Sequence, residues 1–466
     1  MITHLTLNQL SKIEELNALR SYYQAGATKS LAFRKEQLKK LRLAVQKYET
    51  VIAEALYTDL KKSPEEVYAT ETGLVLTEIN VALKNLSQWL EPEDVNTNLV
   101  NLPSGSRVYR DPLGVVLIIA PWNYPMQLLL IPLVGAIAGG NVAVLKPSEV
   151  APATSTVVQK LITETFSPQY IKVIQGDGAE LVPLMMKNFR FDHVFYTGSV
   201  SVGKIIYKLA AEQLVPVTLE LGGKSPAIVE KDANISVAAR RIVLGKYLNA
   251  GQTCIAPDFV LVHMDVKEKL ITKLKQTVQQ FYTPDPASSA DYGKIINEKR
   301  FDTLSGYLKG NIVHGGKHNR QALFIEPTII DGVPDPSSPL WTDEIFGPIL
   351  PVITFQTHEE AKALVERNSN PLAFYLFTNN RKTEKLWIEQ VSFGGGCINN
   401  TAWHFANHHL PFGGVGNSGI GAYHGKGTFD TFTRAKPVMK TPTWFDPPIK
   451  YPPFKGKLRL FKWFFR

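Results

Sequence analysis

Cysteine is scarce in this chain, which has only Cys254 and Cys397 among 466 residues. Two cysteines cannot provide a disulfide framework for so long a chain, so a reducing compartment fits best. Residues 1–16 also lack a basic stretch followed by an apolar run, which is the pattern of a secretory signal. We therefore predict a cytoplasmic protein.

Long apolar runs are missing as well. The two longest apolar stretches, residues 113–120 and 128–138, are separated by Pro121 and Pro125, and Pro132 interrupts the second. A membrane-spanning helix needs roughly 20 uninterrupted apolar residues. The two stretches therefore predict buried strands and helices of a soluble protein.

Acidic residues are nearly absent from the C-terminal end. Residues 434–466 contain nine basic residues and one acid, Asp446, so this basic tail carries +8 of the net charge of +9 and the rest of the chain carries about +1. A near-neutral body gives no electrostatic argument for nucleic-acid binding. We expect no nucleic-acid partner.

The length and the patterning predict an α/β fold with two or three lobes, because 466 residues exceed one hydrophobic core. Apolar residues every three to four positions predict helices across residues 12–90, and residues 98–112 predict a hairpin. Further along, helical segments such as 153–166 and 201–213 alternate with short apolar runs. Strands are predicted at residues 114–120, 141–145, 171–174, 193–196 and 217–219. This alternation is typical of a doubly wound parallel sheet, and a second mixed region runs from residue 225 to about 400.

Cys254 is a candidate nucleophile. It ends the segment Asn-Ala-Gly-Gln-Thr-Cys, whose small residues let the backbone come close to a reacting carbon. A thiolate is strongly nucleophilic near neutral pH. A buried structural cysteine is the common alternative, and Cys397, which follows three glycines, has a similar local claim.

Glu220 and Asn123 are candidates for a general base and an oxyanion donor. Glu220 ends a predicted strand between two leucines, an apolar setting that raises a carboxyl pKa toward general-base duty. Asn123 lies between Trp122 and Tyr124 in a loop stiffened by two prolines, which suits a preorganised oxyanion donor. The alternatives are a surface glutamate beside a turn and a helix-capping asparagine.

Three further segments are candidates for binding a dinucleotide. Two follow predicted strands, at whose carboxyl ends ligands bind in open α/β sheets, and the second of them offers the N–H groups of a helix start to a phosphate. The G-x-G-x-x-G fingerprint is absent, and each segment is weak by itself. The candidate residues are Lys146 and Glu149, then Gly198, Ser199 and Gly203, and finally Glu344 and Phe346.

His404, His408 and His409 form a histidine cluster without an acid or a cysteine that would complete a metal shell. We predict no metal and expect loop or interface histidines.

Taken in order, these segments resemble the aldehyde dehydrogenase superfamily, from about residue 30 to residue 436. The resemblance is closest to the class 3 branch, which includes the fatty-aldehyde enzymes, because of the short N-terminus and residues 252–258 and 425–429. The segments that carry it are 121–123, 146–149, 198–203, 220–224, 251–254, 344–348, 399–400 and 411–414.

The resemblance implies NAD(P)-dependent oxidation of an aldehyde to a carboxylic acid. By it, Cys254 forms a thiohemiacetal and then a thioester, and Cys397 matches a glycine-rich strand instead. The Asn123 amide and the Cys254 N–H hold the oxyanion, and Glu220 activates the hydrolytic water. For the cofactor, NAD or NADP, Lys146 and Glu149 would hold the adenosine ribose, Gly198 and Ser199 would lie near the diphosphate, and Glu344 with Phe346 would position the nicotinamide ribose.

The resemblance also implies a division into parts and a homodimer, because class 3 enzymes are typically dimers. The parts are a cofactor domain at residues 1–97 and 113–219, a catalytic domain at 220–402, bridging segments at 98–112 and 403–433, and the basic tail at 434–466. Trp122, Tyr124 and Phe405 indicate an apolar tunnel for medium or long aliphatic or aromatic aldehydes.

Two other functions remain as alternatives. An enzyme that passes the thioester to coenzyme A does not need a general base at Glu220, and a catalytically silent binding or structural protein does not need Cys254, Glu220 and Asn123 together.

The end of the tail, residues 455–466, interleaves basic residues with leucines and aromatic residues. Twelve residues cannot span a bilayer but can lie in an anionic interface. Peripheral membrane contact at the cytoplasmic face and packing on a partner subunit or beside the substrate entrance fit this pattern equally well.

Overall fold

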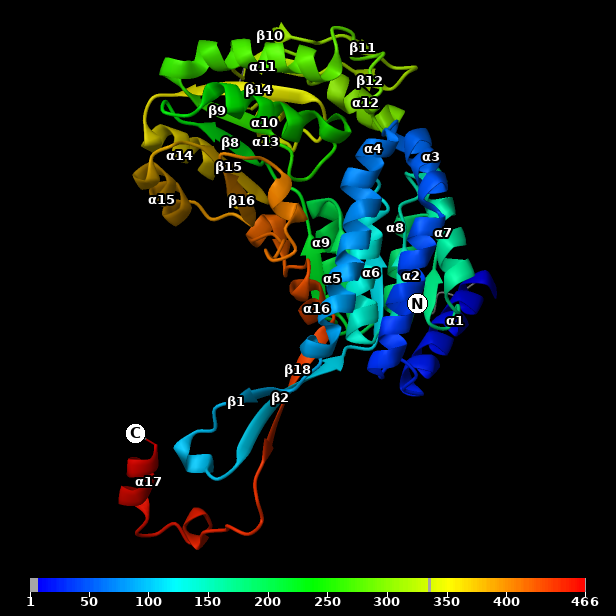
Figure 1. Ribbon diagram of the computed structural model, residues 1–466, viewed down its shortest axis with the longest axis vertical. Helices are drawn as coiled ribbons and strands as arrows, with labels where there is room; N and C mark the ends of the chain where they lie inside the picture. Colours follow the sequence, from blue (N-terminus) through cyan, green and yellow to red (C-terminus); the bar gives the residue numbers. More distant parts are fainter. Residues whose placement is uncertain (1–6, 334–336, 466) are drawn as a thin grey trace.

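The computed structural model describes residues 7–333 and 337–465. Two large lobes lie above a narrow arm (Figure 1). The arm is a three-stranded antiparallel sheet in the order β1-β2-β18, formed by Glu93–Val95, Gly105–Pro112 and Thr433–Lys440. The predicted α/β fold is confirmed.

Helices dominate the start of the chain, as predicted. They are α1 (Leu7–Gln24), α2 (Leu31–Lys47), α3 (Glu49–Leu60), α4 (Pro64–Val67) and α5 (Gly73–Trp89), with a π-helical turn, η1 (Tyr68–Thr72), between the last two. Leu38, Leu41 and Val45 of α2 are fully buried, because residues three and four apart share one helix face.

A six-stranded sheet in the order β17-β7-β6-β3-β4-β5 is the centre of the first lobe. The strands are β3 (Val115–Ile119), β4 (Val142–Lys146), β5 (Ile171–Val173), β6 (His193–Thr197) and β7 (Val217–Glu220), which are parallel, and β17 (Gly419–Ile420), which is antiparallel. The connecting helices are α6 (Gln127–Gly139), α7 (Pro152–Thr165), α8 (Gly178–Asn188) and α9 (Val200–Ala211). The predicted doubly wound sheet is confirmed. Its winding reverses between β3 and β6, where such sheets bind ligands.

The second lobe contains a seven-stranded sheet in the order β10-β13-β14-β9-β8-β15-β16. Its strands are β8 (Pro226–Val229), β9 (Phe259–His263), β10 (Asn311–His314), β13 (Thr328–Asp331), β14 (Ile349–Phe355), β15 (Ala373–Phe377) and β16 (Gly395–Ile398). The helices of this lobe are α10 (Ile235–Tyr247), α11 (Lys267–Tyr282), α12 (Glu298–Ser305), α13 (Pro339–Thr342), α14 (His358–Glu366) and α15 (Arg381–Gln390), and a small ribbon of β11 (His318–Asn319) and β12 (Phe324–Ile325) completes it.

Strand pairing draws the C-terminal boundaries differently from the sequence-based division. The segment 403–433 gives β17 to the six-stranded sheet and helix α16 (Lys426–Thr431) to the first lobe, where it packs on α6. The third strand of the arm, β18, lies almost wholly in the segment assigned to the tail. The hairpin likewise takes β1 from residues before 98. Local sequence patterns do not encode such long-range strand partners, which explains these differences. The division into domains remains a prediction.

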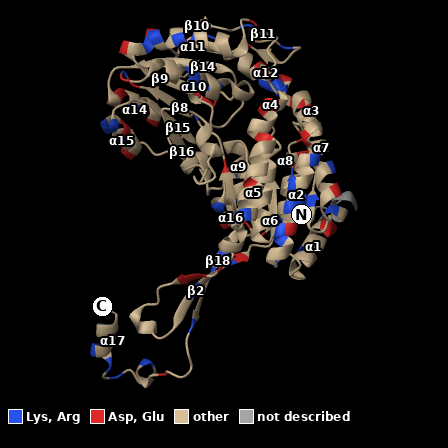
Figure 2. Ribbon diagram, in the orientation of Figure 1, with Lys and Arg blue, Asp and Glu red and all other residues tan. Residues whose placement is uncertain are grey.

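Beyond β18 the chain passes a short 3-10 turn, η7 (Pro448–Lys450), and reaches α17 (Leu458–Phe464), at the same end of the molecule as the arm and away from both lobes (Figure 1). Several tail aromatic side chains are exposed, Trp444 to 78%, Trp463 to 63% and Phe465 to 74%, and basic residues lie between them (Figure 2). Across residues 7–333 and 337–465, no helix combines the length and apolar character needed to cross a membrane.

Candidate active site

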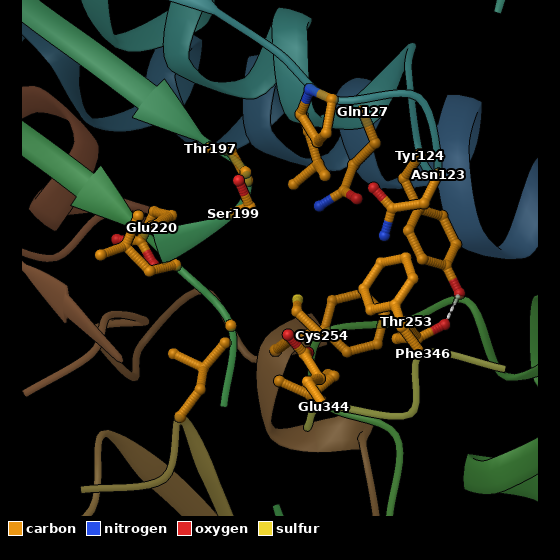
Figure 3. Close-up of a pocket in the computed structure, with 18 of the residues that line it drawn as sticks. Asn123, Tyr124, Gln127, Thr197, Ser199, Glu220, Thr253, Cys254, Glu344 and Phe346 are labelled. Atoms are coloured by element: carbon orange, nitrogen blue, oxygen red, sulfur yellow. Dashed lines mark hydrogen bonds between the residues drawn. The ribbon is translucent and has the colours of Figure 1, made fainter. Parts of the chain in front are cut away.

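A cavity of about 550 Å³ lies at the carboxyl ends of β3, β6 and β7 and is bordered on its other side by residues of the second lobe. Figure 3 shows polar side chains from both lobes pointing into it. Most residues that the sequence predicted for the site line this cavity. They are Trp122, Asn123, Tyr124, Gly198, Ser199, Glu220, Cys254, Glu344, Phe346 and Phe405.

A left-handed turn places Cys254 in the cavity. Between α10 and Cys254, Asn249, Ala250 and Gly251 have φ angles of 53°, 50° and 75°, a conformation that is unfavourable for residues other than glycine. A Cβ at Gly251 would lie 2.3 Å from the carbonyl oxygen of Gly347. Such strain persists where surrounding contacts hold it and is common at functional sites.

The Cys254 thiol is in its neutral form in this environment. Burial, followed by the nearby Glu344 and Glu220 carboxyl groups, raises the pKa of Cys254 to about 12. Because the thiolate is the nucleophile, this cysteine needs a base to take its proton.

Glu220 ends β7 and points into the cavity (Figure 3). Its side chain is buried, and neither carboxyl oxygen has a hydrogen-bond partner among the described residues. Burial raises the pKa of Glu220 well above its usual value, which agrees with the apolar setting that the sequence indicated. A buried carboxyl group without a partner is available to a water molecule or a substrate.

Asn123 is fixed at several atoms. Its Nδ2 donates to the Gln252 carbonyl at 3.0 Å, and its own carbonyl accepts from Lys62 Nζ at 3.0 Å and Asn249 Nδ2 at 2.9 Å. Its Oδ1 has no partner among the described residues. Helix α6 takes Met126 as its N-cap, so Asn123 is not the capping asparagine of the alternative interpretation.

The neighbouring Tyr124 ties the same loop to the cysteine segment. Its hydroxyl group shares a 2.7 Å hydrogen bond with the Thr253 hydroxyl, drawn as a dashed line in Figure 3. The loop after β3 and the residue before Cys254 are therefore joined directly.

Lys146 and Glu149 lie at the end of β4, at the same edge of the sheet but outside the cavity lining. Lys146 Nζ pairs with Glu149 Oε2 at 2.7 Å, and the Gly178 N–H donates to Glu149 Oε1 at 3.2 Å. Burial raises the pKa of Glu149, but the hydrogen bonds from Lys146 and from backbone N–H groups outweigh it and hold the pKa below its usual value. The carboxylate is therefore charged at neutral pH.

The turn between β6 and α9 contains Gly198 and Ser199. Ser199 is the N-cap of α9, and its Oγ accepts from the Val202 N–H at 3.4 Å. Gly203, predicted to bind the cofactor, lies buried in α9 outside the cavity lining. A Cβ there would lie 2.6 Å from a methyl group of Leu221. Gly203 thus lets α9 pack closely on the segment after β7, which is a packing role.

Glu344 and Phe346 enter the cavity from the second lobe. Burial, and next the nearby Asp258, raises the pKa of Glu344 to about 8, and its Oε1 is buried without a partner among the described residues. Phe346 has a φ of 46° and packs edge-on against Trp122, with ring centroids 5.4 Å apart.

These groups fit a nicotinamide dinucleotide. The Glu344 Oε1 and the Thr197 Oγ1 are buried polar atoms without partners among the described residues, and both residues line the cavity. A Cβ at Gly222 would lie 2.0 Å from Glu344 Oε2, so only glycine leaves room for this carboxyl group. Unpaired acceptors and a helix start suit ribose hydroxyl groups and a diphosphate.

Sequence reasoning missed residues that line the cavity and buried charged residues outside its lining. Tyr423 and His424 line the cavity, and Lys246 is a fully buried lysine whose pKa burial lowers to about 8. Lys62 and Glu71 form a buried ion pair behind Asn123. An isolated charge in an amphipathic helical region is typical of a solvated surface residue, so no local signal distinguished them.

The histidine cluster is dispersed in the structure. His404 faces the Cys397 thiol, with Nδ1 3.6 Å from Sγ, while the rings of His408 and His409 lie 4.1 Å apart. Within residues 7–333 and 337–465, no three His, Cys, Asp or Glu side chains are grouped to hold a metal ion.

Comparison with known proteins identifies the fold and the family. The aldehyde dehydrogenase family matches residues 14–438. The chain is 48% identical to the 4,4'-diaponeurosporen-aldehyde dehydrogenase of Staphylococcus aureus, over 96% of this chain and 97% of that protein. It is 42% identical to aldehyde dehydrogenase family 3 member A2 of Macaca fascicularis, over 91% and 87% of the two chains, and 40% identical to the dimeric NADP-preferring aldehyde dehydrogenase of Rattus norvegicus, over 94% and 97%.

Solved structures agree. The substrate-bound state of Staphylococcus aureus AldH superposes with a TM-score of 0.95 at 48% identity, covering 97% of this chain and 99% of that one. An indole-3-acetaldehyde dehydrogenase in complex with NAD+ has a TM-score of 0.83 at 26% identity, covering 93% and 89%.

This chain belongs to the aldehyde dehydrogenase family, in the class 3 branch, and is an NAD(P)-dependent enzyme that oxidises aldehydes.

Proposed function

We propose that this enzyme oxidises aldehydes to carboxylic acids through a thioester on Cys254, with Asn123 as oxyanion donor and Glu220 as general base. The observation that carries the proposal is the convergence of these three side chains on one cavity (Figure 3). Glu220 is buried there without a partner among the described residues, and Asn123 is held rigidly.

The first step forms a carbon–sulfur bond. Glu220 accepts the thiol proton, the Cys254 sulfur attacks the aldehyde carbon, and the carbonyl oxygen becomes an oxyanion. The second N–H of the Asn123 amide and the Cys254 backbone N–H stabilise this charge. Preorganised donors of this kind contribute roughly 3–4 kcal/mol to acyl chemistry.

Bound NAD(P) would supply the acceptor for the hydride of the former aldehyde carbon. Cys254 then holds the acyl group as a thioester. Glu220 releases its first proton to solvent and then accepts a proton from the water that attacks the thioester. Cleavage of the carbon–sulfur bond yields the acid and the Cys254 thiolate, which takes the proton held by Glu220. Glu344 and Phe346 would hold the nicotinamide ribose, Gly198 and Ser199 would lie at the diphosphate, and Lys146 with Glu149 would hold the adenosine ribose.

Hydrolysis is the preferred fate of the thioester. Transfer to coenzyme A does not need a buried general base, whereas the raised pKa of the unpaired Glu220 suits it to activating water. A silent protein would have no use for a strained turn under Cys254.

Apolar side chains favour medium or long aliphatic or aromatic aldehydes as substrates. Trp122, Tyr124 and Phe405 line the cavity together with Leu128 and Phe412. Such a lining contributes free energy roughly in proportion to the apolar area that the substrate buries, so longer aldehydes gain affinity.

The oligomeric state and the tail are further parts of the proposal. A homodimer is supported by the name of the dimeric rat relative. Contact of the tail with anionic lipid at the cytoplasmic face is supported by α17, where exposed Trp463 and Leu458 alternate with Arg459 and Lys462. Aromatic and basic residues together favour the interface of an anionic membrane.

The test of the chemistry is absorbance at the reduced-nicotinamide band with hexanal and NAD or NADP, in the absence of coenzyme A. We expect cofactor reduction by the wild type and a loss of roughly 10³-fold or more in Cys254→Ala. A Cys397→Ala variant is the matched control and is expected to keep full activity. Equal reduction by wild type and Cys254→Ala would remove Cys254 from its role.

A further inference from the structure

We propose that the buried ion pair Lys62–Glu71 is a positioning device for the oxyanion site, which sets the orientation of Asn123 from the N-terminal helices. This inference rests on the proposed role of Asn123. Lys62 follows α3, and Glu71 lies in the π-helical turn η1, so both belong to a region with no other part in the chemistry.

The ammonium group of Lys62 contacts three groups of the surrounding structure. Both side chains of the pair are fully buried, and Lys62 Nζ lies 2.7 Å from Glu71 Oε1. The same Nζ donates to the Asn123 carbonyl at 3.0 Å and lies 3.9 Å from the centroid of the Tyr124 ring. One ammonium group therefore holds the backbone of Asn123 and the next side chain along the loop.

Glu71 holds the other end of the loop. Its Oε2 accepts from the N–H groups of Met126 at 3.1 Å and Gln127 at 2.9 Å, where α6 begins. The pair thus joins the carbonyl of Asn123 to the start of α6 and fixes both ends of the turn that carries the amide. The carboxylate also meets the positive end of the helix dipole.

The π-helical turn is the feature that brings Glu71 to this point. A π-helical turn adds a residue to a helix and is frequent at functional sites. Gly73 follows it, and a Cβ there would lie 2.5 Å from the Tyr68 carbonyl oxygen, so the turn requires glycine. A regular helix would rotate Glu71 away from Lys62 and α6.

The position of Asn123 matters because a shift of about 1 Å in a catalytic group costs on the order of 10²-fold in rate. Asn123 has other restraints, the bonds from Asn249 Nδ2 to its carbonyl and from its Nδ2 to Gln252, but both partners lie in the strained cysteine turn. Lys62 is a restraint from outside that turn, in the segment directly after α3.

The experiment separates positioning from stability with a neutral pair, Lys62→Met with Glu71→Gln. Replacing both partners of a buried pair is often tolerated, whereas removing one leaves an uncompensated charge. The amide introduced at position 71 can still accept from α6 through its carbonyl oxygen, but the methionine introduced at position 62 cannot donate to Asn123. We expect a melting temperature within a few degrees of the wild type and a kcat with hexanal that is roughly 10- to 100-fold lower, with little change in KM for the cofactor.

A second comparison identifies the oxyanion site as the target. In an Asn123→Ala background, the neutral pair should lower kcat by less than about two-fold, because the group being positioned is gone. Alkylation of Cys254 by iodoacetamide develops no oxyanion. The rate of this alkylation in the Lys62→Met, Glu71→Gln variant should therefore equal the rate in the wild type. Asp59→Asn is the matched control, because Asp59 is a buried acid that caps α7 through Ala153 and Thr154. It should lower the melting temperature and leave kcat unchanged.

The outcomes are distinct. Full kcat in the neutral pair, or an equal loss in the Asn123→Ala background, would overturn the positioning role. A slower alkylation of Cys254 would show that the pair supports the cysteine turn instead. If Asn123→Ala itself keeps full activity, the proposed oxyanion role of Asn123 fails, and the positioning role of the pair, which rests on it, fails with it.

Discussion

The cavity and the basic tail carry opposite departures from ordinary protein packing. In the cavity, polar atoms of Glu220, Glu344 and Asn123 are buried without partners among the described residues. In the tail, the large apolar side chains of Trp444 and Trp463 are exposed beside lysines and arginines. Each arrangement is unfavourable in an isolated folded chain, since buried polar groups lack hydrogen bonds and exposed apolar groups lack cover.

The difference supports the two kinds of ligand proposed for these regions. Unpaired polar groups that line a cavity suit ligands that form hydrogen bonds, here a dinucleotide, an aldehyde and water. Exposed aromatic residues with basic neighbours suit an apolar surface with negative charge, which supports the proposed membrane contact of the tail. Substituting the unpaired polar residues of the cavity can therefore stabilise the folded protein, whereas substituting the exposed aromatic residues of the tail should have little effect on its stability.

The largest expected effect is on the cavity side. Glu220→Gln should lower kcat by roughly 10²- to 10⁴-fold, the contribution of a general base. In the wild type, the raised pKa of Glu220 means that its ionised fraction grows as pH rises, so kcat should increase from pH 6 to pH 9. Steady-state rates across this range measure both. A wild-type rate that is flat from pH 6 to 9 would contradict the assignment.

The same substitution should stabilise the fold. Because the folded pKa of Glu220 is raised, the native state binds more protons than the unfolded state once pH exceeds the usual carboxyl pKa of 4.5, so its contribution to stability falls as pH rises. Glu220→Gln removes the ionisable group but leaves a buried polar one, so we expect a gain in the free energy of unfolding that is small near pH 5 and grows as pH rises. Urea unfolding at pH 5 and pH 8 should show a larger gain at pH 8. A loss at both values would mean that Glu220 has partners in solution.

A smaller effect, on cofactor preference, is expected at the end of β4 in the six-stranded sheet, where Lys146 and Glu149 are paired. Glu149→Gln removes the charge that would repel a 2′-phosphate, so the ratio of kcat/KM for NADP to that for NAD should rise by about tenfold, or 1.4 kcal/mol. Initial rates with each cofactor measure the ratio, and Glu180→Gln on α8 serves as an exposed control. An unchanged ratio would place the adenosine ribose elsewhere.

The smallest effect on catalysis is expected in the tail. Replacing Trp463 and Phe465 with serine should leave kcat with hexanal within about two-fold of the wild type, because surface substitutions away from the site are nearly neutral. Binding to anionic vesicles in a sedimentation assay should fall roughly tenfold, with truncation at Pro453 as the limiting case. Equal sedimentation of the intact and truncated proteins would exclude membrane contact and favour packing on a partner subunit.

Sequence patterns were sufficient wherever the cause is local. Short apolar runs predicted the five parallel strands of the six-stranded sheet, since a buried strand must be apolar along its own length, but not β17. The flanking leucines correctly indicated a raised pKa for Glu220. The choice of Cys254 over Cys397 needed more than local sequence, because both follow small residues. It came from the order of segments along the chain.

Tertiary structure alone decided which distant residues meet. Thr433 pairs with Pro112 and Gly419 with Glu220, and Lys62 reaches the Asn123 carbonyl. Side-chain periodicity records which face of an element is buried and not which partner covers it. The sequence by itself therefore determined the chemistry and the repertoire of elements. Only the packing of two lobes and an arm decided the burial that shifts the pKa values and the contacts that hold Asn123.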